Sequence, residues 1–156
     1  MGQGSFLYGG RWNAPGSFRA VYGSTVDVVA VQESRANAEY AGISLPFRTP
    51  RLLVVVELAL RKVLDLTTAE TLAAMDVTAD ELRAEDWRKV QAEGFESFTQ
   101  SLGRAVFESD ANGLLVPSAR VADGVTVVYL PENRATADEA NVCEAEQLDR
   151  MRGVKY

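Results

Sequence analysis

The stretch that decides the fold is GGRWNAPGSFRAVYGSTVDVVAVQE, residues 9–33. Its first eight residues are rich in Gly, Asn and Pro and predict a turn. Residues 18–22 alternate in polarity and predict a short strand. Ser24 or Thr25 can then cap a helix that begins near residue 26 and ends at Gly42. Turn, strand and helix each contribute one residue to a series spaced by eleven: Arg11, Tyr22 and Glu33.

The rest of the chain predicts both strands and helices. Residues 51–57 are β-branched and nearly continuous in hydrophobicity, which indicates a buried strand. Two capping-box patterns, Thr67 with Glu70 and Thr78 with Glu81, predict helix starts, the second helix running to Ala92. An amphipathic helix is expected over 97–107, a turn over 110–113, strands over 114–116 and 125–130, and an acidic helix over 137–151.

These elements do not alternate regularly, so the sequence predicts an α+β protein with mixed sheets and flanking helices. A length of 156 residues favours one domain, 1–156, with the acidic helical segment 137–151 at its C-terminal end. A chain of this size can bury about 70% of the surface that its unfolded form exposes, which is enough for one core.

The composition restricts the function. The formal net charge is −6, which disfavours direct contact with nucleic acid. The chain has no histidine, so Ser-His and Cys-His catalysis and His-based metal sites are excluded. One cysteine cannot form an internal disulfide, and neither a signal sequence nor a membrane-spanning run is visible. We therefore expect a cytoplasmic protein.

Several residues could carry chemistry, and each also has a structural interpretation. Arg11 could offer its planar guanidinium to a phosphate, or its glycine neighbours could simply form a hairpin corner. Glu33 could stabilise a cationic transition state, or be a solvated helix residue. Tyr22 could stack on a ligand ring or pack in the core. Ser118 and Asn133 each follow a strand and could face a cleft or only form turns.

The acidic residues of segment 76–86 do not have the loop spacing of a calcium site. We interpret them as solvated helix starts and faces, and we expect no metal.

Three segments resemble the signatures of the RES domain family. GGRWN, followed by VYGS and VAVQE, resembles the first; LLVPSA resembles the second; VTVVYLPEN resembles the third. Between them, LLVVVELALRKVLDLTTAETL is similar to the middle strand of the family and the turn after it. The resemblance extends from about Phe6 to about Asn133, and the three segments occur in the family's order.

The resemblance implies a fold similar to ADP-ribosyltransferases and an enzyme that degrades NAD as a bacterial toxin. NAD would be the substrate, cleaved at the nicotinamide–ribose bond by hydrolysis or phosphorolysis. The implied catalytic residues are Arg11, Glu33 and Ser118, with NAD bound by Arg11, Tyr22, Ser118 and Asn133. Two alternatives stay open, transfer of ADP-ribose to a protein target and an inactive module that binds a nucleotide or a partner.

The resemblance also implies a protein partner. Toxins of this family pair with an antitoxin that covers the cleft and carries a helix-turn-helix domain for DNA. An acidic toxin fits that division, because DNA contact is left to the partner. A homo-oligomer within the complex is compatible with this expectation. For a dianionic cofactor we also expect local positive potential from Arg11, with Arg19 or Arg48 nearby.

Overall fold

The computed structural model describes residues 1–40, 42 and 53–143. The helices are α1 (Gln3–Tyr8), α2 (Asp27–Tyr40), α3 (Ala69–Ala74), α4 (Ala79–Ala84), α5 (Trp87–Ala92), α6 (Phe98–Glu108) and the 3-10 turn η1 (Pro131–Asn133). The strands are β1 (Val21–Ser24), β2 (Val56–Ala59), β3 (Val63–Asp65), β4 (Gly113–Pro117), β5 (Val125–Tyr129) and β6 (Glu139–Val142). Within the described ranges, no helix has the length and apolar character to cross a membrane.

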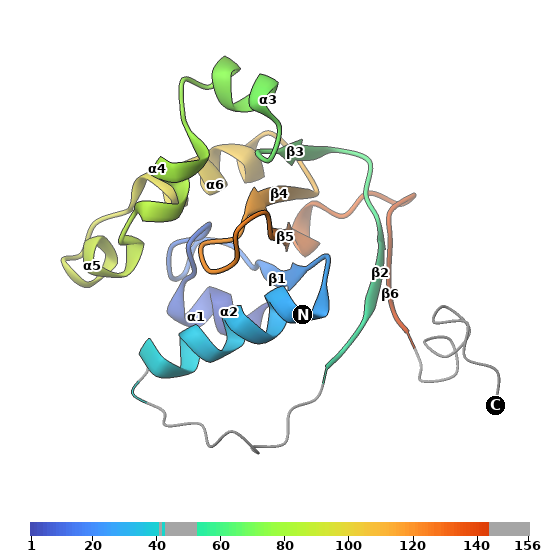
Figure 1. Ribbon diagram of the computed structural model, residues 1–156. Coiled ribbons are helices and arrows are strands. Elements are labelled where there is room, and N and C mark those ends of the chain that lie inside the picture. The colour runs from blue at the N-terminus through green and yellow to red at the C-terminus, as the bar shows by residue number, and fades with distance from the viewer. Residues whose placement is uncertain (41, 43–52, 144–156) are drawn as a thin grey trace.

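A four-stranded sheet with the order β1-β5-β4-β3 forms the centre of the molecule (Figure 1). β5 pairs antiparallel with both of its neighbours, whereas β3 pairs parallel with β4. A separate ribbon of β2 and β6 runs alongside this body. Helices and mixed sheets therefore coexist without regular alternation, which confirms the predicted α+β class.

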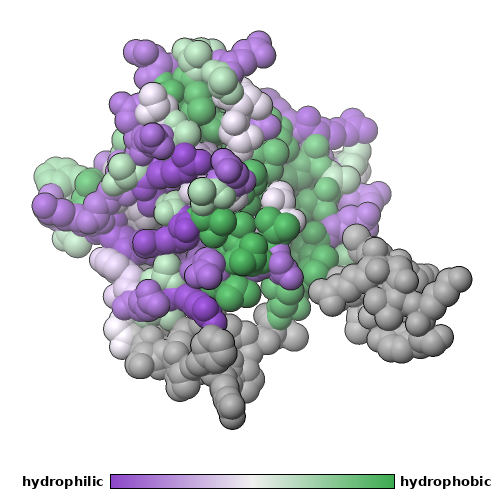
Figure 2. Space-filling view, in the orientation of Figure 1, coloured by the Kyte–Doolittle hydropathy of each residue, from purple (hydrophilic) through white to green (hydrophobic). Residues whose placement is uncertain are grey.

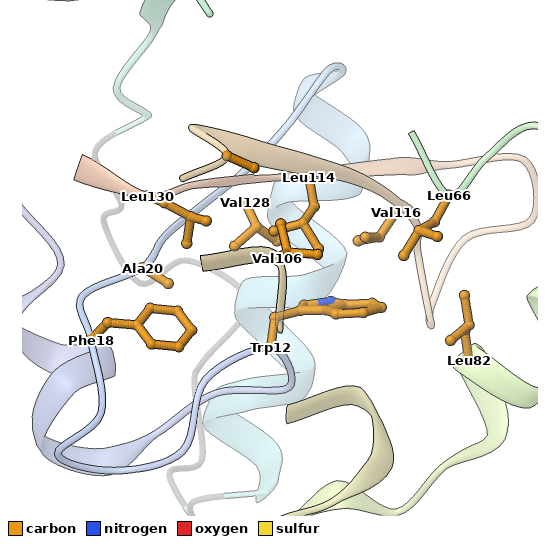
Figure 3. Close-up of a cluster of buried hydrophobic side chains, with 11 residues drawn as sticks. Trp12, Phe18, Ala20, Leu66, Leu82, Val106, Leu114, Val116, Val128 and Leu130 are labelled. Carbon is orange, nitrogen blue, oxygen red and sulfur yellow. The ribbon is translucent and has the colours of Figure 1, made fainter. Parts of the chain in front are cut away.

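The core lies against one face of the central sheet (Figure 3). Leu114 and Val128 are paired across β4 and β5, and both are completely buried. Leu130 and Val116 extend this row of side chains, and the indole of Trp12 lies beneath it. Trp12 belongs to the turn at the start of residues 9–33, so this turn is part of the core.

Helix α6 packs closely on that turn. Ser97 and Gln100 form a capping box at its N-terminus. The carboxylate of Glu85 accepts hydrogen bonds from the N–H groups of Phe98 and Thr99 at 2.6 and 3.0 Å. A Cβ at Gly103 would lie 1.9 Å from the carbonyl oxygen of Trp12. The absence of a side chain at Gly103 therefore allows the helix to approach the turn.

Most local signals are confirmed. The helix predicted to end at Gly42 is α2, and Gly42 has φ 69° with its N–H donating to the carbonyl of Glu39. The capping box of Thr78 and Glu81 is present at α4. The predicted strand 18–22 lies slightly later in the chain, as β1, because Phe18 and Ala20 enter the core before pairing begins.

Two helix predictions need local correction. The box expected from Thr67 and Glu70 is wrong by one residue, because Thr68 caps α3 and accepts from the N–H of Thr71. The helix expected to run from 78 to 92 is divided into α4 and α5. Glu85 has an extended ψ of 126°, and its side chain caps α6. Asp86 then caps the new helix by accepting from the N–H of Lys89.

The buried strand expected over 51–57 is also wrong. Residues 51 and 52 lie outside the described ranges, Leu53 and Val54 are 44% and 50% exposed, and pairing starts only at Val56. This strand, β2, pairs with β6 instead of entering the central sheet, and hydrophobic surface is visible on this side of the molecule (Figure 2). Continuous hydrophobicity therefore does not mark a central strand here.

The acidic helix expected over 137–151 is contradicted where it can be compared. Residues 139–142 form β6, which is aligned residue by residue with β2. Asp138 is buried and its carboxylate accepts from the N–H groups of Arg61 and Ala135. These bonds fix a turn before the strand. Residues 144–151 lie outside the described part of the chain.

Gly103→Ala is expected to destabilise the fold by at least about 2 kcal/mol, because the new methyl group would overlap backbone that cannot rotate away. Gly4→Ala is a matched control, since Gly4 is also helical and nothing lies within 4 Å of its added Cβ. Urea unfolding should show a stability equal to or up to about 1 kcal/mol above wild type for Gly4→Ala. Equal stability of Gly103→Ala and wild type would contradict the packing described here.

Candidate active site

The turn of residues 10–13 is held by buried hydrogen bonds. Gly10 and Asn13 exchange backbone bonds, and Asn13 is completely buried. Its Nδ2 donates to the carbonyls of Ser5 and Phe18 at 2.8 and 3.1 Å. Gln100 Nε2 donates to the carbonyl of Gly10 at 3.0 Å. Buried amides that are satisfied in this way fix one conformation of a turn.

Arg11 is anchored by helix α4. Its Nη1 donates to the carbonyls of Leu82 and Glu85 at 2.8 and 3.1 Å. Burial lowers the pKa of Arg11, although the neighbouring carboxylates of Glu85 and Glu33 act in the opposite direction. The guanidinium stays charged, because arginine side chains are not deprotonated in proteins. The two carbonyls of Leu82 and Glu85 both accept from Nη1. The edge of the guanidinium that carries Nη2 can therefore bind a ligand.

Tyr22 contributes its ring to the cleft and its hydroxyl to the turn. The hydroxyl donates to Asn13 Oδ1 at 2.8 Å and accepts from the N–H of Trp12 at 3.0 Å. A Cβ at Gly10 would lie 2.4 Å from this hydroxyl, so Gly10 allows the close approach. Burial raises the pKa of Tyr22, and the phenol therefore stays neutral.

Glu33 and Ser118 are in direct contact. The hydroxyl of Ser118 donates to Glu33 Oε1 at 2.6 Å and accepts from the N–H groups of Arg120 and Val121 at 3.1 and 3.2 Å. Ser118 is buried, with 1% of its surface exposed. Its hydroxyl therefore holds the carboxylate of Glu33 from the protein interior, and Ser118 does not itself line the cleft.

A cleft of about 800 Å³ brings these elements together. Arg11, Tyr22 and Glu33 all line it, so the residues spaced by eleven in the sequence meet in one place. One wall is a single face of α2, whose lining residues recur at helical spacing: Ala30, Glu33, Ser34, Asn37 and Tyr40. Val116 and Thr126, which are cross-strand partners, extend the core face of the sheet into the cleft.

Two further arginines line the cleft, and sequence reasoning missed both. Arg88 comes from α5 and Arg120 from the segment after β4. Both charges act on Arg11 and lower its pKa. Arg120 could have been predicted to lie near the cleft, because it follows the second family signature, LLVPSA, directly. No local sequence pattern indicated Arg88.

The structure does not bring Asn133 to the cleft. Its Nδ2 donates to the carbonyls of Phe107 and Ala111 at 2.7 and 3.0 Å, at the C-terminal end of α6. Asn133 therefore ties η1 to the core. Arg19, expected near Arg11, instead pairs with Glu132 at 3.1 Å and does not line the cleft. Arg48 lies outside the described residues.

Comparisons with known proteins give one family. The family model described as RES domain matches residues 1–150. Curated relatives from Mycobacterium bovis and Mycobacterium tuberculosis, each named NAD(+) phosphorylase MbcT, are 28% identical over 135 residues, covering 85% of this chain and 68% of theirs.

Among solved structures, the crystal structure of the M. tuberculosis MbcT–MbcA toxin–antitoxin complex matches with a TM-score of 0.68. The match has 24% sequence identity and covers 92% of this chain and 73% of that chain. The likeness shows a shared fold, consistent with the architecture that the sequence resemblance implied.

Tyr22→Phe is expected to destabilise the protein by about 1–3 kcal/mol, because the N–H of Trp12 and Oδ1 of Asn13, both in buried residues, would lose their partner. Tyr8→Phe is the matched control, since Tyr8 is 76% exposed. Urea unfolding of the three proteins measures the difference. A Tyr22→Phe protein as stable as Tyr8→Phe would show that the hydroxyl does not hold the turn.

Proposed function

The chain belongs to the RES domain family, and from this premise we propose that it degrades NAD by cleaving the nicotinamide–ribose bond, as the toxin of a toxin–antitoxin pair. The observation that carries the proposal is the convergence of Arg11 and Glu33 on one cleft. A guanidinium suits diphosphate, and a carboxylate suits a sugar cation. NAD presents both groups in one molecule.

Glu33 is proposed to stabilise the reacting sugar. When the bond breaks, nicotinamide leaves with the bonding electron pair and becomes neutral, and positive charge develops on the ribose. A carboxylate beside the ribose lowers the energy of that state, as carboxylates do in glycoside cleavage. Ser118 is a positioning residue in this scheme, because it touches Glu33 and is buried beneath it.

Arg11 and Tyr22 are proposed to orient the dinucleotide. The edge of the Arg11 guanidinium that the α4 carbonyls leave available would bind the diphosphate. The ring of Tyr22 would pack on the nicotinamide or the adjacent ribose, because its hydroxyl is held in the turn. Asn133 is not included, since its side chain bonds to the end of α6.

Inorganic phosphate is the proposed acceptor. The curated relatives are named NAD(+) phosphorylase, which supports attack by phosphate on the ribose rather than by water. Attack forms a bond between a phosphate oxygen and the ribose carbon that nicotinamide leaves. The products are nicotinamide and ADP-ribose carrying a new phosphate. Labelling of a protein target instead would indicate ADP-ribose transfer.

An antitoxin is the proposed partner. A solved structure with this fold is a toxin–antitoxin complex, which supports a protein that restrains the activity. We further propose that the antitoxin carries a helix-turn-helix domain and covers the cleft, that the pair acts in the cytoplasm, and that it can assemble as a homo-oligomer. An acidic toxin then leaves DNA to its partner.

Glu33→Gln is expected to lower nicotinamide release from NAD by about 10²–10³-fold, because the amide cannot stabilise developing positive charge. Released nicotinamide, measured by chromatography with and without added phosphate, tests this. Glu39→Gln is the matched control, since Glu39 lies on the same helix but does not line the cleft. Parent-level release by Glu33→Gln would refute the assignment.

Ser118→Ala is expected to lower kcat about tenfold or more with little change in KM for NAD, because the carboxylate would lose its hydrogen bond while the walls of the cleft stay in place. Steady-state kinetics separate the two constants. Ser118→Thr should recover part of the loss, because it restores a hydroxyl. A change in KM alone would instead place Ser118 in substrate binding.

A further inference from the structure

Three guanidinium groups line the cleft, and in the described part of the chain none of them forms an ion pair within 4 Å. Ion pairs within 4 Å are formed by Arg19, Arg83 and Arg104, none of which lines the cleft. Arg11, Arg88 and Arg120 line it. Glu33 is the single carboxylate among the described lining residues, so the three arginines leave the cleft with a net positive charge that a bound anion would stabilise.

Arg88 is held in one orientation by groups from two helices. Its guanidinium carbon lies 4.4 Å from the centre of the Tyr40 ring, on α2, and 4.3 Å from that of Trp87, on α5. Nη2 donates to Asn37 Oδ1, also on α2, at 2.5 Å. Aromatic faces and an amide fix the plane of the guanidinium but leave most of its five N–H donors for a ligand.

The electrostatic surroundings of Arg88 agree with an anion site. Burial lowers the pKa of Arg88, and the charge of Arg120 lowers it further, while Tyr40, Asp86 and Glu33 act in the opposite direction. Arg11 is already anchored on the α4 carbonyls. Arg88 and Arg120 come from two further elements, and Arg88 is held by side chains of α2, not by the α4 carbonyls.

We propose that Arg88, oriented by Tyr40, Trp87 and Asn37, forms with Arg120 a second phosphate-binding site in the cleft, separate from Arg11. Its ligand is a phosphoryl group, from either the diphosphate of a dinucleotide or free inorganic phosphate. The anion site rests on the geometry alone, whereas its use of these two ligands in a reaction rests on the proposed function. Two phosphate sites would match a reaction that takes a diphosphate and a free phosphate together.

Calorimetric titration with two probes, ADP-ribose and inorganic phosphate, tests the site without requiring turnover. Arg88→Gln and Arg120→Gln should each weaken at least one probe by about 10- to 100-fold, the effect of a lost charged hydrogen bond. Weaker ADP-ribose binding identifies the diphosphate as ligand, and weaker phosphate binding identifies the free anion. Arg88→Lys should recover only part of the affinity, because an ammonium keeps the charge but cannot form a planar fork.

Arg19→Gln is the matched control, since Arg19 pairs with Glu132 outside the cleft, and it should bind both probes as wild type does. Thermal melting of each variant checks that it folds. If Arg88→Gln does not fold, the affinities of Arg120→Gln provide the test. Unchanged affinity of folded Arg88→Gln for both probes, or no binding of either probe to wild type, would overturn the proposal. Nicotinamide release by wild type is measured separately, so failure of the proposed function is distinguishable from failure of this site.

Discussion

The structure depends on one buried amide, that of Asn13. Its two ends bond to the carbonyls of Ser5 and Phe18 and to the hydroxyl of Tyr22, in a place that water does not reach. A buried amide without these partners would be costly, so the turn has one well-defined conformation. That conformation directs Trp12 into the core, and the preceding Arg11 lines the cleft. Folding and the candidate site are therefore coupled through a single turn.

Elements with signals inside their own sequence could be predicted, and elements defined by a distant partner could not. Helices α2 and α6 and strands β4 and β5 were expected close to their observed bounds, because caps, periodicity and turn residues are local. β2 was expected in the core and β6 as a helix. Both are strands only because they pair with each other across about eighty residues of chain, and no local pattern reports such a pairing.

The candidate site shows the same division. Arg11, Tyr22 and Glu33 were found by resemblance to a family, and they meet in the cleft because turn, strand and helix are consecutive. Asn133 was expected beside them, yet its amide is used by the end of α6. Arg88 was missed because its orientation depends on Tyr40, Trp87 and Asn37 together. The helical spacing of Ala30, Glu33, Asn37 and Tyr40 places them on one face of α2, and this pattern could have predicted the wall of the cleft that α2 forms.

Net charge describes the surface of this protein and not its cleft. The chain as a whole has a formal charge of −6, but the cleft lining contains three arginines and one glutamate, which sum to +2. The ligand proposed for it has the same uneven character, with a negative diphosphate at one part and a sugar that becomes positive at another. Arginines from three separate elements suit the first, and a single carboxylate, held from beneath by a buried serine, suits the second. An acidic exterior does not weaken this match, because fields inside a cleft are set by the nearest charges and distant ones are screened.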